Sequence, residues 1–481
     1  MILIDDVRIG SAATRLLTEP AAVAVDAGRI TAVLRSEGER LAACARADEV
    51  VAGDGKILIP GLVNAHTHSY CNVLRGTENS LPLEPWALYT VAYGRSLDDE
   101  AIRLSILIGA AEMIRNGITA CVDHFAHFAR APAALAAHRE SGMRVGFAPM
   151  MQDLPDHRIL GLELPPDLLR RLEATPPQTA SQVERLFRDL AAILPGRDGL
   201  VTLMLGPNAP QRCSPVLLDV WRRLADELGL PVHTHCLETW PQAAAGQRDW
   251  PGGTVGEMAR RGLLGPRLSI AHGIWLDPAE RDLLAAHDVA VVHNPASNMM
   301  LGSGRMPLED YLRRGVALAI GSDSANTGGR NDIFEIMRLA MMMHRLALPL
   351  DDWPKPERVF EMATLGGARV LGRERELGRI APGQCADLVL LRPDGAAMTA
   401  GRPDIATIVQ HGSADSVAAV MIGGTWVYRD GRILSFDEQA ILDRYGELRV
   451  AILAGAAPAL ALADEARPYF ERPYRSGDRR Q

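Results

Sequence analysis

The middle of the chain alternates between short apolar runs and longer segments with helical periodicity, and this alternation constrains the fold most strongly. Eight runs rich in Val, Ile and Ala are predicted strands, at residues 61–68, 120–125, 144–150, 200–207, 231–235, 268–273, 289–295 and 316–323. The segments between them have helix caps, for example Asp98 at one start and Gly117 at the following end. A strand-then-helix unit repeated eight times predicts a closed (β/α)₈ barrel, with a doubly wound parallel sheet as the alternative.

Both ends of the chain have a different pattern. Residues 1–58 and 378–435 contain short strand-like runs separated by turn signals, and neither segment could bury a core alone. We therefore predict that they pair into a small β-sandwich beside a barrel formed by residues 59–377. Residues 436–481 are predicted to form a helical tail, and its last dozen residues, polar and arginine-rich after Pro468, are expected to be loosely held.

Composition excludes several classes of function. The net charge of −8, with no basic stripe interleaved with aromatics, argues against a nucleic-acid or anionic membrane partner. No apolar run approaches the roughly 18 residues that span a bilayer, and the first residues do not resemble a secretory signal. The six cysteines contain no CxxC pair, which favours neither a disulfide framework nor a cysteine zinc site. We expect a cytoplasmic protein with a small-molecule substrate.

Histidines gather where the predicted strands end, which is the face where barrels carry their catalytic groups. Of the 13 histidines, seven lie at or near those ends: His66, His68, His124, His233, His235, His272 and His293. Chance placement would rarely give this excess.

Two of these strand ends contain histidine pairs. His66 and His68 end the first strand, and His233 and His235 end the fifth, with Glu238 three residues further on. Alternate residues of a strand point to the same side, so each pair can share one metal ion. Spacing alone does not decide which histidine of the second pair binds. Hydrogen-bonded core histidines and a solvent-facing glutamate are the structural alternatives.

Single polar residues end two further strands. His272 ends the sixth, and Asp323 ends the eighth after an apolar run, where the alternatives are a structural histidine and a helix cap. Imidazole nitrogens with one carboxylate suit zinc, with iron as the alternative, and an open coordination position would hold a water of lowered pKa. His272 could orient that water and Asp323 could accept its proton, while Glu238 acts on the substrate as acid or base.

Five motifs contain these strand ends: PGLVNAHTH at 60–68, HCLE at 235–238, AHG at 271–273, HNPASNMMLGSG at 293–304 and GSDSA at 321–325. Together they resemble the amidohydrolase superfamily. More narrowly, they are similar to its mononuclear branch of aromatic deaminases and chlorohydrolases, which includes adenosine-derivative, guanine and 8-oxoguanine deaminases and the s-triazine hydrolases. The resemblance covers roughly residues 1–435, with the motifs in the expected order.

The resemblance implies a distorted (β/α)₈ TIM barrel with a β-sandwich built from both terminal segments, and a homo-oligomer, dimeric or tetrameric. It also implies one divalent metal, held by His66, His68, His235 and Asp323. The resemblance further implies that Glu238 carries a proton to the ring nitrogen or leaving group and that His272 polarises the water. His233 would then be a neighbouring residue and not a ligand.

Lysine is nearly absent from the chain. Of 51 basic residues only Lys56 and Lys355 are lysine. Dinuclear members of the superfamily that the motifs resemble bridge their metals with a carboxylated lysine at a strand end. Lys56 precedes the first predicted strand and Lys355 lies between prolines in a loop, so we predict a site for one metal.

The candidate substrate residues are less specific. Trp86 could lie against a flat ring, and packing is its alternative role. A polar heterocycle or an anionic group could be recognised by Asn208, Gln211, Arg212 and Arg330, with a surface ion pair as the alternative role of the arginines. The pocket wall could be shaped by Ser297 and Asn298. The roles of His124 and His127 stay undecided between pocket lining and core.

Three segments depart from the pattern of nucleoside-type relatives. Asn208 follows Gly-Pro where a histidine is expected, the acidic residue that holds ribose is replaced within 91–95, and residues 326–332 differ after Asp323. These departures argue against a nucleoside substrate.

The sequence therefore predicts a hydrolase that removes ammonia, or another leaving group, from a nitrogen-rich heteroaromatic ring by attack of a metal-bound hydroxide. Hydrolysis of an acyclic amide or urea-type C–N bond by the same residues is the alternative. A catalytically silent binding or scaffold barrel is the third hypothesis. It is disfavoured because none of the six candidate metal and catalytic residues is missing.

Overall fold

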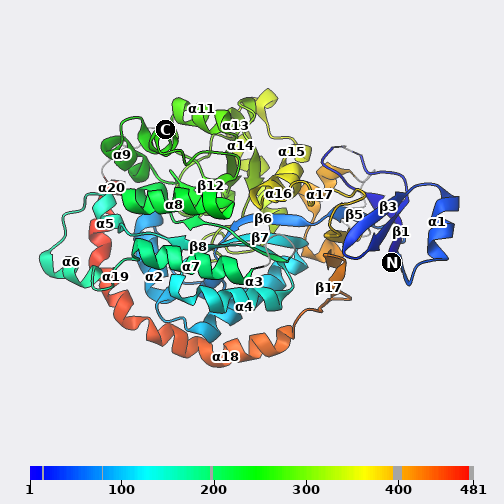
Figure 1. Ribbon diagram of the computed structural model, residues 1–481, viewed down its shortest axis with the longest axis horizontal. Helices are drawn as coiled ribbons and strands as arrows, with labels where there is room; N and C mark the ends of the chain where they lie inside the picture. Colours follow the sequence, from blue (N-terminus) through cyan, green and yellow to red (C-terminus); the bar gives the residue numbers. More distant parts are fainter. Residues whose placement is uncertain (14–15, 79, 195–198, 394–403, 476–481) are drawn as a thin grey trace.

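The computed structural model describes residues 1–481 except 14–15, 79, 195–198, 394–403 and 476–481. It consists of a barrel surrounded by helices, with a separate β-sheet at one end of the long axis (Figure 1). This arrangement confirms the predicted fold class of a distorted α/β barrel with an appended β-structure.

All eight predicted barrel strands are present, and the fourth is split in two. The strands are β6 (Leu62–Thr67), β7 (Ile118–Phe125), β8 (Arg144–Met151), β9 (Val201–Leu203), β10 (Gly206–Pro207), β11 (Val232–Cys236), β12 (Leu268–His272), β13 (Ala290–His293) and β14 (Leu318–Ile320). They pair in parallel as two arcs, β10-β8-β7-β6 with β9 also on β8, and β11-β12-β13-β14. Small apolar residues from both arcs form one buried cluster, which includes Val63, Ala120, Ala148, Val292 and Ala319.

Single parallel bridges join the two arcs at both seams. One bridge pairs Leu205 with Val232, and the other pairs Thr67 with Asp323. At the second seam the Asp323 amide donates a 2.9 Å hydrogen bond to the His66 carbonyl. The ring of strands is therefore closed, and these short seams are where it is distorted. They also place the candidate ligands His66 and Asp323 side by side.

Helices surround the barrel, and several of them begin at side-chain caps. The outer helices are α3 (Asp99–Arg115), α4 (Ala131–Ser141), α7 (Ala180–Ile193), α8 (Pro215–Leu228), α10 (Gly253–Arg260), α11 (Pro278–Ala286), α13 (Leu308–Arg313), α14 (Ile333–Arg345), α15 (Pro356–Glu361) and α16 (Gly367–Val370). The predicted cap Asp98 accepts a hydrogen bond from the Ala101 amide, and Ser214 caps α8 in the same way. Further helices lie in the loops: α2 (Leu83–Gly94), α5 (Asp156–Ile159), α6 (Pro166–Leu172), α9 (Trp240–Asp249), α12 (Pro295–Met300) and α17 (Ile405–His411).

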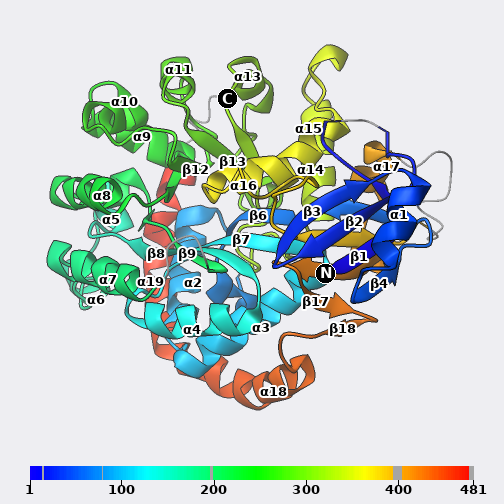
Figure 2. The same cartoon turned by 45° about the vertical axis from the view of Figure 1, so that its right-hand side comes forward.

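Both ends of the chain contribute to one nine-stranded sheet (Figure 2). Its strands are β1 (Ile2–Ile9), β2 (Ala21–Asp26), β3 (Arg29–Leu34), β4 (Glu49–Ala52) and β5 (Ile57–Pro60), then β15 (Leu388–Leu391), β16 (Val417–Ile422), β17 (Thr425–Arg429) and β18 (Arg432–Ile433), with helix α1 (Glu37–Cys44) between β3 and β4. The two segments meet where β5 pairs antiparallel with β15. Their apolar side chains share a core that includes Ile4, Val23, Leu58, Leu390 and Met421. The exact domain boundaries at residues 58, 377 and 435 stay predictions.

The C-terminal segment wraps along the outside of the barrel. Helix α18 (Glu438–Gly455) leaves the terminal sheet, and α19 (Ala457–Phe470) and α20 (Arg472–Arg475) continue toward α2 (Figure 1). The Tyr474 hydroxyl donates a hydrogen bond to buried Glu84. The expectation of a loose end is therefore wrong up to residue 475, because this aromatic side chain anchors it; residues 476–481 lie outside the described part. No single described helix is long and apolar enough to cross a membrane, although α18 and residues 457–475, bent by 48°, pass the criteria of length and composition together.

Candidate metal centre and active site

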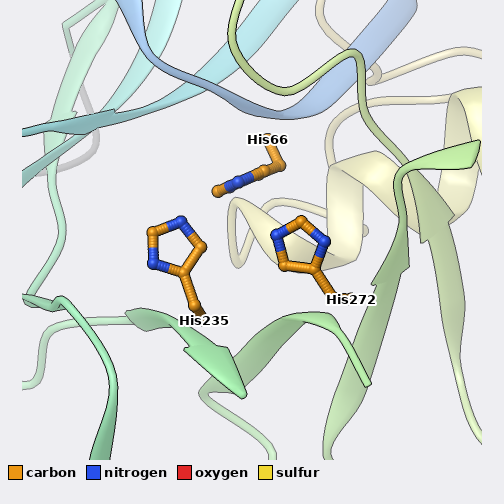
Figure 3. A group of neighbouring side chains, drawn as sticks. All are labelled: His66, His235 and His272. Atoms are coloured by element: carbon orange, nitrogen blue, oxygen red, sulfur yellow. The ribbon is translucent and has the colours of Figure 1, made fainter. Parts of the chain in front are cut away.

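A cavity of about 310 Å³ opens at the carboxyl ends of the barrel strands. His66 comes from β6, His235 from β11 and His272 from the end of β12, and their imidazole rings turn toward one another (Figure 3). Asp323, next to β14, and His68, next to β6, complete the group. All five side chains are buried.

The distances within this group fit a metal ion. His66 Nε2 and His68 Nε2 lie 3.4 and 3.3 Å from Asp323 Oδ1, and His68 Nε2 lies 3.2 Å from His235 Nε2. Zinc ligands bind at about 2.0–2.1 Å in a tetrahedron, which puts neighbouring ligand atoms about 3.3 Å apart. The three measured separations agree with that spacing. His68 Nε2 and His235 Nε2 face each other at hydrogen-bond distance. A cation between them would be bound by the lone pair of each nitrogen.

The opposite ring nitrogens of the same histidines are all engaged. His68 Nδ1 donates to the His124 carbonyl, and His235 Nδ1 donates to the Asn208 carbonyl at 2.7 Å. His66 Nδ1 lies 2.8 Å from His233 Nε2. A hydrogen bond at Nδ1 fixes the tautomer in which Nε2 is free to coordinate, so the three rings are oriented as ligands. The buried His66 Nε2 atom has no other hydrogen-bond partner among the described residues.

The structure separates the roles of the other two strand-end histidines. His233 uses Nε2 for His66 and Nδ1 for the Ser269 hydroxyl at 2.8 Å, so it holds His66 in place. His124 stacks beside His68, with ring centroids 5.7 Å apart, and neither of its nitrogens has a partner among the described residues. Of the fifth-strand pair, His235 therefore faces the centre and His233 lies behind it.

Glu238, His272 and Asp323 form the second half of the site. Glu238 Oε2 lies 3.4 Å from His272 Nε2, which lies 3.7 Å from Asp323 Oδ2. The Ser303 hydroxyl donates a 3.2 Å hydrogen bond to Glu238 Oε1. Two carboxylates and a histidine nitrogen thus surround one point beside the metal ligands. Such a group can move protons to and from a reacting molecule.

Burial and charge set different protonation states in this group. Burial raises the pKa of Glu238 to about 7 and lowers the pKa of His66 to about 4. Burial opposes the ionisation of Asp323, but the adjacent imidazoles of His66 and His68 hold its pKa well below the usual value. At neutral pH His66 is therefore a neutral ligand, Asp323 is a carboxylate, and Glu238 can either give or take a proton.

The backbone at the site is strained. Leu237, His272 and Asp323 have positive φ angles of 47°, 73° and 63°. Non-glycine residues rarely adopt this left-handed region, and the free-energy cost is of order 1–3 kcal/mol each. The three residues lie at the carboxyl ends of β11, β12 and β14. The surrounding packing therefore maintains a strained backbone that aims Glu238, His272 and Asp323 inward.

A buried network supports Glu238 from the side of α2. Glu84 Oε1 accepts hydrogen bonds from Thr239 Oγ1 at 2.9 Å and Gln242 Nε2 at 3.1 Å, and Gln242 Oε1 accepts from the Glu238 amide. Burial raises the pKa of Glu84. Neither this carboxylate nor its partner Tyr474 was predicted from the sequence. The sequence signal that could have indicated a buried Glu84 is its position among apolar residues in the 81–86 segment.

The seven predicted substrate residues divide into two groups. Trp86, Asn208 and Arg212 line the cavity, and Asn208 also holds His235. The other four are not among the described residues that line it: Gln211 and Arg330 line two separate surface cavities, whereas Ser297 and Asn298 are buried.

The loops account for this division. Gln211 lies in the 3₁₀ turn that follows β10 and lines a second cavity, and Arg330, in the loop after Asp323, lines a third. Asn298 lies behind His272, whose Nδ1 atom is 2.9 Å from Asn298 Oδ1. It therefore orients a catalytic candidate instead of forming the wall.

Arg212, a predicted candidate for an anionic group, lines the cavity, and so does His127, which the sequence left undecided. Tyr70, Arg95 and Asp156 also line it and were not predicted. Arg95 lies at the end of α2, and Asp156 and Arg212 come from loops after β8 and β10. No strand-end pattern marks these positions, because loop conformations bring them together.

The closed barrel and its histidine–aspartate centre define a metal-dependent hydrolase. The model of the amidohydrolase family matches residues 57–427. The chain is 34% identical to a 5′-deoxyadenosine deaminase of Methanothermobacter thermautotrophicus, covering 85% of this chain and 90% of that one. It is 32% identical to a 5-methylthioadenosine/S-adenosylhomocysteine deaminase of Nitratidesulfovibrio vulgaris, covering 92% and 95%.

A solved structure is also similar. The structure of an adenosine deaminase from Xanthomonas campestris with bound zinc superposes with a TM-score of 0.81 and 26% identity, covering 94% of this chain and 98% of that one. The chain belongs to the amidohydrolase family. The resemblance inferred from the motifs is confirmed.

Proposed function

We propose that this protein is a mononuclear, zinc-dependent deaminase that hydrolyses an exocyclic amino group from a nitrogen-rich heteroaromatic ring. Membership of the amidohydrolase family makes it a hydrolase that acts on C–N bonds. The observation that carries the ring assignment is the position of Glu238. Its carboxyl group lies 3.4 Å from His272 Nε2, beside the candidate ligands, where a ring nitrogen can receive a proton.

His66, His68, His235 and Asp323 would hold the ion. A divalent zinc ion at this centre activates a water molecule by lowering its pKa. Zinc is supported by the ligand spacing and by the similar adenosine deaminase from Xanthomonas campestris, which was crystallised with bound zinc. Iron is the second candidate because imidazole and carboxylate ligands also suit it.

The protein residues move the protons of the hydrolysis. His272 Nε2 accepts a hydrogen bond from the attacking water, because its Nδ1 atom donates to Asn298. Asp323 takes a proton from the water, and protonated Glu238 donates one to the ring nitrogen, so that no localised anion forms on the ring. The water oxygen bonds to the ring carbon, and the amino group leaves as ammonia with a proton returned from Asp323. Glu238 recovers its proton when the ring product adopts its oxo form.

The deaminase relatives do not favour the alternative of acyclic amide or urea hydrolysis. The sequence argument against a nucleoside substrate included Asn208. The deaminase relatives are named for adenosine derivatives, and their names favour a nucleoside substrate. Because Asn208 orients His235, it does not have to recognise a sugar. We therefore rank 6-aminopurines and their nucleosides first, ahead of pterins, pyrimidines and triazines.

Two broader features belong to the same proposal. All six cysteines are free, which supports a reducing compartment such as the cytoplasm. Exposed apolar side chains on and after α14, including Met342, Leu346 and Leu350, support assembly into a dimer or tetramer. Light scattering would test the assembly, because a purely monomeric protein would contradict it.

Ammonia release tests the proposed reaction directly. The purified, zinc-loaded protein would be incubated with aminopurines, adenosine derivatives, pterins, aminopyrimidines and triazines, each beside an acyclic amide and a urea of similar size. Release of ammonia from at least one ring, with none from the acyclic compounds, supports the proposal. Release from the acyclic compounds alone would overturn it.

A further inference from the structure

Helix α2 presents one face to the active-site cavity. Trp86, Ala87, Thr90, Val91 and Arg95 line the cavity, and their spacing places them along one side of the helix. At 1.5 Å per residue, the backbones of Trp86 and Arg95 are about 13 Å apart. The cavity wall thus runs from an aromatic side chain at one end to a cation at the other.

Arg95 is a cation without a protein partner. Its exposed side chain makes no ion pair or hydrogen bond with any residue that the structure describes, although it lines the cavity. The other arginine of the cavity, Arg212, donates to both carboxylate oxygens of Asp156 at 2.7 and 3.0 Å. The remaining cavity carboxylates, Glu238 and Asp323, belong to the metal end.

Two polar side chains of the cavity wall hydrogen-bond to other protein groups. Gln152 accepts a hydrogen bond from Asn208, and Gln178 donates to the Met150 carbonyl. The guanidinium group of Arg95 is thus left to water or to a bound molecule that offers an acceptor. At the other end of the cavity wall the buried Trp86 Nε1 atom also has no partner among the described residues.

We propose that Arg95 binds an anionic group, a carboxylate or a phosphate, on a substituent of the ring that is deaminated. This inference rests on the proposed function and names its substrate class. Guanidinium groups bind both anions through paired N–H donors. The length of α2 leaves room for a substituent between the ring and Arg95. The arginine would select the acidic substrate without taking part in the chemistry at the metal.

Matched probes test the inference. Three 6-aminopurines would carry the same short alkyl chain on the ring, ending in a carboxylate, a phosphate monoester or a neutral carboxamide. We expect kcat/KM for ammonia release to be about tenfold higher for the preferred anion than for the carboxamide, mainly through KM, which is the scale of one charge-assisted contact. The carboxylate and phosphate probes distinguish the two anions.

Substitutions then assign the preference to Arg95. Arg95→Ala should remove the preference by lowering kcat/KM for the anionic probe to that for the carboxamide, Arg95→Lys should keep part of it, and Arg95→Glu should reverse it. Arg432→Ala is the matched control, since Arg432 is exposed and unpaired among the described residues but lies on the terminal sheet. Dissociation constants measured on Glu238→Gln protein give a second readout without turnover.

The outcomes separate this inference from the proposed function. If the rings release ammonia but wild type shows no anion preference, or Arg95→Ala retains it, Arg95 is not the anion site and the deaminase proposal stands. If none of the ring compounds, including those without a substituent, releases ammonia, the proposed function fails and the inference falls with it.

Discussion

The Nδ1 atom of His272 lies 2.9 Å from the Oδ1 atom of Asn298, and both side chains are buried. An amide oxygen only accepts, so the proton of the imidazole is held at Nδ1 and the lone pair at Nε2 faces Glu238 and Asp323. His272 comes from the end of β12 and Asn298 from α12. This hydrogen bond thus links two consecutive barrel units to the orientation of one catalytic candidate.

Removing this acceptor should impair catalysis without removing the metal. We expect Asn298→Ala to lower kcat by about 10–100-fold, the usual range for an orienting partner at a metal site. Metal content should stay near that of wild type, because Asn298 contacts none of the four candidate ligands. Activity assays and metal analysis of the same preparation check this. Full activity in the variant would show that His272 needs no such orientation.

Glu238 and His68 should have separable roles. Glu238→Gln should retain the metal and lose turnover by about 10²–10⁴-fold, since the amide cannot carry the proton. His68→Ala should lose both metal and turnover, because one of the four candidate ligand atoms is removed. Near-normal activity of the glutamine variant would exclude Glu238 from the mechanism.

The protein should bind about one tightly held metal per chain. Lys56 contacts the Gly53 carbonyl and Asp54, and Lys355 immediately precedes α15, so neither lysine can bridge two metals at a strand end. Elemental analysis of extensively dialysed protein measures the ratio. A reproducible value of two metals per chain would contradict a mononuclear site.

The C-terminal end should affect both stability and catalysis. Tyr474→Phe removes a hydrogen bond to buried Glu84, which we expect to lower the free energy of unfolding by about 1–3 kcal/mol. Because Glu84 holds Thr239 and Gln242 beside Glu238, kcat should also fall. Denaturant unfolding and steady-state assays measure the two effects.

The matched control for this variant is Tyr469→Phe. The Tyr469 hydroxyl has no hydrogen-bond partner among the described residues, although its ring packs in the same C-terminal segment. The control should leave stability and kcat close to wild type. Equal effects of the two substitutions would show that the Tyr474–Glu84 contact has no special role.

The metal-free protein should become less stable as the pH falls. Burial lowers the pKa of His66 from 6.5 to about 4 in the folded state, so the unfolded chain binds more protons between these values. Above pH 6.5 neutral His66 makes its full contribution to the free energy of unfolding, and this contribution is lost as the pH falls to 4. The protonation of His66 should lower the free energy of unfolding by about 3 kcal/mol. Denaturant unfolding of chelated protein from pH 7 to pH 4 measures it.

Two variants refine this test. His66→Gln should reduce the pH dependence of unfolding, whereas His287→Gln, at an exposed position, should leave it unchanged. An identical pH dependence in wild type and His66→Gln would contradict the assignment to His66.

The strand-end residues could be predicted because their signal is local. The apolar period indicated where β6, β11, β12 and β14 end, and the polar residues at those ends were therefore expected at one rim of the barrel. His66, His272 and Asp323 were found from such spacing, and the structure brings them together.

The choice within the second histidine pair needed the tertiary structure. His233 and His235 share one side of the strand, so no sequence period distinguishes them. His233 lies 2.8 Å from the Nδ1 atom of His66, whereas His235 lies 3.2 Å from the Nε2 atom of His68. These contacts span 167 residues of the chain. The motif resemblance chose His235, and the geometry supplies the reason.

The sequence by itself determined the barrel, the paired terminal strands and the ring of polar residues at the strand ends, because hydrophobic periodicity acts over a few neighbouring residues. Only the tertiary structure decided which side chains line the cavity. It placed Arg95 in the wall and Arg330 outside it, and it brought Tyr474 to Glu84 across 390 positions. Loop paths and long-range packing set those contacts, and no local pattern encodes them.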